Sequence, residues 1–224
     1  MHRVRLLLII STFLLLGSIA SFGEPWVTRE GLLHTAAPVV RQPAAAPGLF
    51  LVSSRALTDP HFSRTVIYLV AHNDEGSLGL VINRPSEIRL ADAVSGVDAE
   101  AGEDHAIYYG GPVRHNMITM LIRSEQENPL VRQVDDDVFF SHDRRVLDRL
   151  LDEHKPTDAL RFYMGHAGWV PGQLQQEIER GEWFVISADP VTIFSSRPAS
   201  LWTRLIDKLD PGGLYVGLAR PPYA

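Results

Sequence analysis

The stretch "YMGHAGWVPGQLQQEI", Tyr163–Ile178, is decisive for the fold because a strand, a tight turn and a helix start follow one another within it. The run "LRFYMG" predicts a strand that ends at Gly165, and Pro171 suits the first turn of a helix, where its missing N–H costs nothing. Leu174 falls on the face of that helix that we expect to be buried, and Gly181 is suited to follow its last turn. The stretch therefore predicts a strand–turn–helix unit.

The same stretch raises a functional question at its centre. Val170 has no side-chain acceptor, so the first N–H groups of the predicted helix need another partner. A bound anion or carboxylate would fit there, since helix N-termini favour negative charge, and a distant side chain, a backbone carbonyl or water would serve equally. Trp169 suits a packing anchor better than a ligand platform. His166 is open to three interpretations: a base, a ligand contact or a turn residue.

Around this unit, short β-rich runs alternate with a few helices. The predicted strands are residues 49–54, 65–72, 77–83, 106–111, 117–124, 138–141, 160–165 and 183–188. The second and third are joined by "NDEG", whose Asn, Asp and Gly favour a hairpin turn. Apolar residues at helical spacing predict helices over 142–154, capped by Ser141, and over 199–209. The pattern indicates an α+β fold: a mixed, mainly antiparallel, barrel-like sheet with flanking helices.

Composition limits the classes of function. The 224 residues include 45% hydrophobic and 21% charged residues, which is ordinary for a globular domain. A net charge of −6 and the lack of any basic cluster larger than a pair argue against direct nucleic-acid binding. The absence of cysteine excludes disulfides, thiol nucleophiles and cysteine-ligated zinc. No cofactor is predicted.

The N-terminus carries a targeting signal. Residues 1–23 combine Arg3 and Arg5 with an apolar run and small residues near Ala20, which is typical of a cleaved secretory signal peptide. An uncleaved membrane anchor and a start codon placed too far upstream are the alternatives; the latter would leave a cytoplasmic protein. Residues 24–47 are rich in Ala and Pro and predict a linker. The domain is expected over 48–224, exported, with membrane contact only through the N-terminal segment.

Several local motifs are candidate functional sites. Asn83 and Arg84 end a strand and could offer an amide and a cation to an acidic ligand, or serve only as a turn cap and an ion-pair partner. His72 follows a strand directly and either caps the "NDEG" turn or acts as a base. The run 135–137, three aspartates, is more typical of a solvated turn than of a cation site. Neither the histidine spacing nor any G-x-S-x-G pattern supports a local metal site or a nucleophile elbow.

Four blocks in order identify a resemblance. "DPHFSRTVIYLVAH", "GSLGLVINRP", "YYGGPV" and "GHAGWVPGQLQQEI" together resemble the YqgE/AlgH family of bacterial proteins, over about 48–218. The resemblance implies a barrel-like sheet with flanking helices and a regulatory role, including an ascribed role in transcription, without a settled biochemical activity. The positions that match the family pattern are Asp59, Phe62, Thr65, His72, Gly76, Gly79, Asn83, Arg84, Pro85, Gly110, Gly111, Pro112, Gly165, Gly168, Trp169, Gly172, Gln173, Leu174 and Glu177.

This chain departs from the family pattern at three points. Many relatives carry tyrosine at the position of His166, which weakens schemes that need histidine chemistry there. Some carry cysteine at the position of Val70, so no thiol mechanism can be essential in this protein. The predicted export signal also differs from the family expectation of a cytoplasmic protein.

The leading hypothesis is a non-enzymatic regulatory or binding module that holds a small acidic molecule or a peptide. Its candidate cleft is lined by six residues, of which all but His166 match the family pattern: His72, Asn83, Arg84, His166, Trp169 and Gln173. The alternatives are a hydrolytic or transfer enzyme with His72 or His166 as base and Arg84 stabilising negative charge, and, more weakly supported, a DNA-binding regulator. The partner, whether a protein or a small molecule, is not specified by the sequence.

Overall fold

A computed structural model describes residues 42–97, 105–123, 129–154 and 156–213. The predicted export signal and most of the predicted linker therefore lie outside the described residues. These described residues all belong to one compact unit. Within the described ranges, no helix has the length and apolar character needed to cross a membrane.

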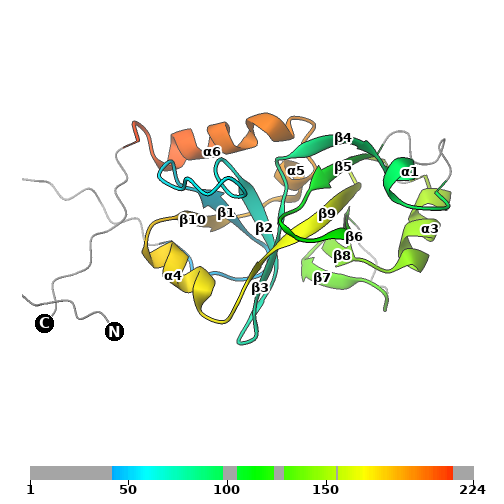
Figure 1. The fold of residues 1–224 in the computed structure, drawn as a ribbon, viewed down its shortest axis with the longest axis horizontal. Coiled ribbons are helices and arrows are strands. Elements are labelled where there is room, and N and C mark those ends of the chain that lie inside the picture. Colours follow the sequence, from blue (N-terminus) through cyan, green and yellow to red (C-terminus); the bar gives the residue numbers. More distant parts are fainter. Residues whose placement is uncertain (1–41, 98–104, 124–128, 155, 214–224) are drawn as a thin grey trace, which may run out of the picture. The chain divides into compact units, whose positions relative to one another are not determined.

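A curled ten-stranded sheet forms a half-barrel (Figure 1). Its strands are β1 (Leu49–Ser53), β2 (Val66–Asn73), β3 (Gly76–Val81), β4 (Pro85–Arg89), β5 (Ala106–Tyr109), β6 (Val113–Arg123), β7 (Arg132–Asp135), β8 (Val138–Ser141), β9 (Leu160–Trp169) and β10 (Trp183–Ser187). The order along the main path is β10-β1-β2-β3-β9-β6-β8-β7, and β5 joins β4 to β9. Only the β5–β9 pair is parallel among the described pairings, so the predicted mixed, mainly antiparallel sheet is confirmed.

The strand β9 is the centre of the sheet, and it is longer than predicted. It runs past Gly165 to Trp169, where the sequence pattern had suggested an end at Gly165. Before this glycine β9 pairs with β6 and β5; after it the strand pairs with β6 once more at His166 and with β3 from Ala167 to Trp169. Gly165 has φ of +70°, a left-handed conformation that glycine adopts without steric cost. The backbone can therefore turn within the strand and pair with different neighbours on each side.

Helices cover the sheet in separate places (Figure 1). They are α1 (Leu90–Ala93), α3 (Arg144–Asp152), α4 (Gln173–Glu179), α5 (Pro190–Ile193) and α6 (Leu201–Leu209), with a 3₁₀ turn at Pro198–Ser200. α6 and α5 pack on the core that contains Tyr68 and Tyr163, α4 packs on the core that contains Trp169 and Trp183, and α3 packs on a third core around Phe162. The predicted flanking helices are thus present.

Both helix starts near the predicted sites differ from the prediction. The cap of α3 is Asp143, whose carboxylate accepts from the backbone N–H of Arg145, because Ser141 is still part of β8 and donates to the carbonyl of Leu130. The helix α4 begins after Gly172, which has φ of +76°, rather than at Pro171. Gly181 has φ of +75° beyond its end, as predicted for that position.

The last residues of the predicted linker make contacts with the sheet. The side-chain carbonyl of Gln42 accepts a hydrogen bond of 2.7 Å from the backbone N–H of Val185 in β10. Ala45 packs against the core around Trp169. The β10 edge, which pairs with β1 on its other side, is therefore partly satisfied by the segment that leads into the domain.

Candidate functional site

The predicted site residues Asn83 and Arg84 hold a loop in place. The amide of buried Asn83 accepts from the N–H of Val66 at 2.8 Å and donates to the carbonyl of Arg64 at 3.0 Å. The Arg84 guanidinium donates to the carbonyls of His61 at 2.7 Å and Ser63 at 2.9 Å. Burial lowers the pKa of Arg84, and the nearby Asp59 charge opposes this shift. Both side chains are thus engaged with backbone, which leaves little of them for a ligand.

Trp169 and Gln173 lie together around Glu177. The carboxylate of Glu177 accepts from the indole N–H of Trp169 and of Trp183, each at 2.8 Å, and from the Gln173 amide at 2.9 Å. The Trp169 ring also stacks on Phe62, with 6.2 Å between the ring centroids. This arrangement agrees with the interpretation of Trp169 as a packing anchor. At the start of α4 the backbone N–H of Gln173 donates to the carbonyl of Val170 at 3.1 Å, so a backbone carbonyl satisfies this N–H group.

His72 lies at the end of the confirmed β2–β3 hairpin, where it is exposed. Its Nδ1 is 2.7 Å from the hydroxyl of Ser77. A hydrolase would also need a group that orients the histidine, usually a carboxylate. No such contact to His72 is present among the described residues, so this pair supports the enzyme hypothesis weakly.

His166 lies on a different face of the sheet from Trp169. Ala167 and Trp169 belong to the core beneath α4. The side chain of His166 is on the opposite face of β9, the face towards which a Cβ at Gly168 would also point. The six predicted residues are therefore distributed: Asn83 and Arg84 hold a loop, Trp169 and Gln173 meet at Glu177, and His72 and His166 each stand apart. They do not form one cleft, because the alternation of side chains along β9 sends neighbouring residues to opposite faces.

A groove of about 1030 Å³ opens in front of His166. It lies between the β2–β3 hairpin, the start of β6 and the β7–β8 hairpin. Its apolar lining consists, among the described residues, of Ala71, Leu78, Val113, Met117, Pro129, Leu130, Val131 and Phe140. Its polar lining includes Arg114, Arg132, Gln133, Ser141, His142, Asp143 and His166. Val113 and Leu130 are two of the five large apolar side chains that the described residues leave exposed, so the groove offers both apolar surface and charge.

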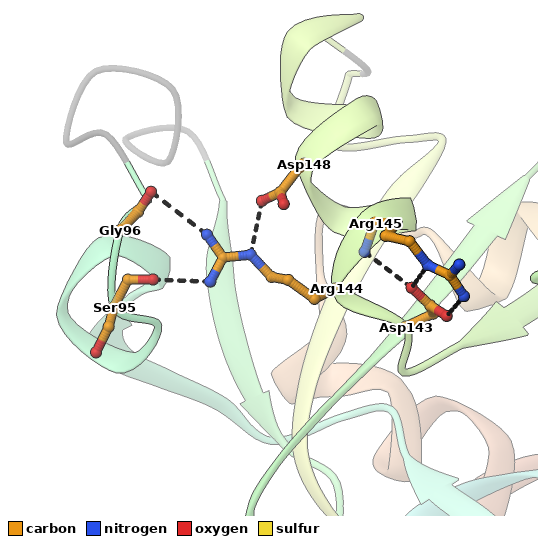
Figure 2. Close-up of polar contacts among 6 residues, drawn as sticks. All are labelled: Ser95, Gly96, Asp143, Arg144, Arg145 and Asp148. Carbon is orange, nitrogen blue, oxygen red and sulfur yellow. Dashed lines mark hydrogen bonds and ion pairs between the residues drawn. The ribbon is translucent and has the colours of Figure 1, made fainter.

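The charge of the groove is cationic. The guanidinium of Arg114 is exposed and has no ion-pair partner among the described residues, and that of Arg132 lies 5.7 Å from the ring centroid of Phe140. Asp143, the one carboxylate among the described lining residues, is neutralised by Arg145, with oxygen–nitrogen distances of 2.6 and 3.0 Å (Figure 2). The hydrogen bonds from Arg145 lower the pKa of Asp143 to about 2, so the pair remains ionised and neutral overall.

Arg144, the first residue of α3, fixes the position of the helix next to the Asp143–Arg145 pair. Arg144 donates to Asp148 at 2.6 Å and to the carbonyl of Ser95 at 2.7 Å, and it also reaches the carbonyl of Gly96 (Figure 2). This side chain ties α3 to the loop that follows α1. The helix start that carries Asp143 is therefore held from both sides.

His166 is a buried polar residue of the groove whose ring keeps a nitrogen without a partner among the described residues. It is 8% exposed, and its Nδ1 has no hydrogen-bond partner among the described residues. Burial, and then the charge of Arg114, lower the pKa of the imidazole below its ordinary value of 6.5. The ring is consequently neutral near pH 7, and the buried Nδ1 keeps a hydrogen-bonding capacity that no described residue satisfies.

The lowered pKa of His166 predicts how stability depends on pH. A depressed histidine pKa means that the unfolded state binds the proton more readily, so its stabilising contribution is present above pH 6.5 and is lost as the pH falls below that value. We expect the wild-type free energy of unfolding to decrease between pH 7.5 and pH 5.5 more than that of His166→Asn. Urea unfolding at both pH values measures the two differences. Parallel pH profiles would contradict the shift.

Arg114 and Arg132 were not predicted from the sequence. Each is an isolated arginine in a strand, and they come from segments that the sheet brings together, so no local spacing marks them. Arg114 has φ of +52°, one of three non-glycine residues with positive φ in the described chain. Strained backbone of this kind often accompanies functional sites. Among the described residues, no group of three or more His, Asp or Glu side chains is suited to bind a metal ion.

Known proteins share both the sequence pattern and the fold. A family described as AlgH-like (DUF179) matches residues 50–212. A UPF0301 protein of Chlorobium luteolum is 35% identical over 179 residues, covering 79% of this chain and 92% of the relative. The solution structure of the AlgH protein from Pseudomonas aeruginosa matches with a TM-score of 0.65 and 29% identity, over 76% of this chain and 92% of that one. Protein DIP2367 from Corynebacterium diphtheriae shares the fold, with a TM-score of 0.64 and 23% identity over 80% of this chain and 95% of that chain.

Proposed function

The chain belongs to the AlgH-like family, and from this premise we propose that it is a non-enzymatic binding module whose groove holds a small acidic molecule or an acidic peptide. The observation that carries the proposal is the buried, unpartnered Nδ1 of His166 beside the exposed guanidinium of Arg114. A buried polar atom without a partner costs free energy unless a ligand or water satisfies it.

The charges around the groove favour an anion over a cation. Arg114 and Arg132 supply two positive charges, and Asp143 is neutralised by Arg145. Guanidinium groups suit carboxylates because they donate two parallel hydrogen bonds. The apolar lining, with exposed Val113 and Leu130, would contact the carbon skeleton of the ligand.

The enzyme alternative receives less support from the same contacts. The hydroxyl of Ser141, which also lines the groove, already donates to the carbonyl of Leu130 and accepts from the N–H of Asp143. Among the described lining residues, His166 therefore has no free serine nucleophile beside it. The acidic net charge of −6 likewise offers little to a DNA backbone.

A binding experiment with charged probes tests the proposal. We expect a fluorescein-labelled hexaglutamate peptide, and separately citrate as a competitor, to bind the full-length protein. Arg114→Gln with Arg132→Gln should weaken the binding by about tenfold, since each exposed charge pair contributes up to about 1 kcal/mol. Fluorescence anisotropy at low and high salt measures the effect, which salt should reduce.

A matched control separates the groove from general charge. Arg204 and Lys208 are exposed on α6, and Arg204→Gln with Lys208→Gln removes the same two charges at another place. Binding of hexaglutamate that falls equally in this control, or equal binding of hexalysine, would contradict the proposal. Displacement by citrate at similar affinity would favour the small molecule, and failure of citrate to compete would favour the peptide.

A further inference from the structure

A charged side chain of β9, Arg161, is buried and does not belong to the lining of the groove. Arg161 is in β9, two residues before Tyr163, and residues two apart in a strand share a face. It is 6% exposed, although arginine is rarely buried unless it is paired. The sequence "LRFYMG" shows it as a lone charge within an apolar strand.

The contacts of Arg161 leave its charge without a counter-charge. One guanidinium nitrogen, Nη2, donates to the carbonyl of Ser195, and the group lies over the ring of Tyr108 at 4.8 Å from the centroid. The other, Nη1, is buried with no hydrogen-bond partner among the described residues, and no carboxylate there forms an ion pair with Arg161. A buried cation is costly unless a negative group and hydrogen bonds compensate it.

Two buried hydroxyls accompany this cation. Tyr163 and Tyr68 are fully buried. The Tyr68 hydroxyl has no partner among the described residues, and the Tyr163 hydroxyl makes no hydrogen bond of normal geometry there, although the Arg161 guanidinium lies close enough to lower the Tyr163 pKa as a hydrogen-bond donor would. The Tyr163 and Tyr108 rings are 5.5 Å apart, which places the hydroxyl-bearing ring beside the ring that Arg161 covers. Burial raises the pKa of Tyr163 and of Tyr68, so both are neutral O–H donors at physiological pH.

The charged residues around the buried tyrosines indicate which end of this cluster favours a negative group. Arg161 acts on Tyr163 electrostatically, and its charge opposes the rise of the Tyr163 pKa. Asp135 and Asp137, in the β7–β8 hairpin, act on Tyr68 in the opposite sense. A negative group is therefore favoured near Arg161 and Tyr163 and disfavoured towards the aspartates beyond Tyr68.

We propose that Arg161 and Tyr163 form an internal site for one small oxyanion, a phosphate or a carboxylate group. Tyr68 lies at the edge of this site. Nη1 of Arg161 and the Tyr163 hydroxyl would donate to the oxyanion, and its charge would neutralise the buried guanidinium. The site is separate from the groove in its residues, and it does not depend on the proposed function. Its occupant is small, because the surrounding side chains belong to the packed core beneath α5 and α6.

Calorimetric titration with two simple anions tests the proposal. Sodium phosphate, and separately sodium acetate, are titrated into the full-length protein at an ionic strength held constant with sodium chloride. We expect one of them to bind with one-to-one stoichiometry and to raise Tm by roughly 5–10 °C once its concentration exceeds Kd about 100-fold. Tighter binding of phosphate would assign phosphate chemistry, and tighter binding of acetate would assign a carboxylate.

Variants decide where the anion binds. Tyr163→Phe removes only a hydroxyl and should weaken binding roughly fivefold, and Arg161→Gln should abolish it within the accessible range. Tyr68→Phe should have a smaller effect than Tyr163→Phe. If Arg161→Gln does not fold, Tyr163→Phe still tests the site because its shape is preserved.

Three results would overturn the proposal. If neither phosphate nor acetate binds, water alone satisfies the buried groups. Binding that is unchanged in Tyr163→Phe and Arg161→Gln would place the anion elsewhere. Binding that is lost in Arg114→Gln with Arg132→Gln, and retained in Arg161→Gln, would assign the anion to the groove instead.

Discussion

Replacement of Gly165 by alanine is expected to destabilise the protein by about 4 kcal/mol. The residue has φ of +70°, where an added Cβ costs roughly 1–2 kcal/mol by itself. That Cβ would also press against the carbonyl oxygens of Gly111 and Val113. These are backbone atoms next to β9 and cannot move aside alone, so overpacking adds about 1–3 kcal/mol. Urea unfolding of the full-length protein measures the loss.

Gly172 is the matched control for this prediction. Its φ of +76° is almost the same, but no atom lies within 4 Å of the position that its Cβ would take. Gly172→Ala should therefore show only the cost of the backbone conformation, about 1–2 kcal/mol. Equal losses in the two variants would mean that contact with the Gly111 and Val113 carbonyls contributes nothing.

The same glycine shows why the sequence predicted the strands better than the site. The β2–β3 hairpin, the strand at Val138–Ser141 and the helices α3 and α6 follow from turn residues and apolar spacing, which are local. Simple alternation from Tyr163 would put Ala167 on its face of β9. The turn of the backbone at Gly165 shifts the alternation by one residue. His166, and not Ala167, therefore lies on the same face of β9 as Tyr163.

The groove and the internal cluster depend on long-range pairing that no local pattern contains. Arg114 and Arg132 are brought near each other because β8 pairs with both β6 and β7. Arg161 did carry a sequence signal, since a single arginine within an apolar strand predicts either an exposed edge or a buried charge with a purpose. Because β9 is central, with neighbours on both sides, Arg161 is a buried charge and not part of an exposed edge.

The resemblance was more informative for stability than for binding. Asn83, Arg84, Trp169, Gln173 and Glu177 match the family pattern, and each makes hydrogen bonds within the protein. A pattern of polar residues can therefore report the support of a fold as readily as a ligand site. Among the six predicted residues, His166 alone lines the groove.

The second large effect is expected at Glu177, where alanine should cost about 3 kcal/mol. This carboxylate accepts from the indole N–H groups of Trp169 and Trp183 and from Gln173, and those donors are partly buried. Its removal leaves two indole groups unsatisfied, and each unsatisfied buried donor costs about 1–3 kcal/mol. Thermal unfolding followed by tryptophan fluorescence reports the loss, because two of the affected rings are indoles.

Two further variants isolate the role of the Glu177 carboxylate. Glu179 is on the same helix and exposed, with Gln175 as its side-chain partner, so Glu179→Ala should change the free energy of unfolding by less than about 0.5 kcal/mol. Glu177→Gln keeps one oxygen that can accept from both indoles, since both bonds in the wild type end on Oε2. We expect it to lose only about 1 kcal/mol. A Glu177→Gln loss as large as that of Glu177→Ala would show that negative charge, and not the shared acceptor, holds the two tryptophans, whereas a Glu177→Ala loss no larger than that of Glu179→Ala would remove Glu177 from the support of β9.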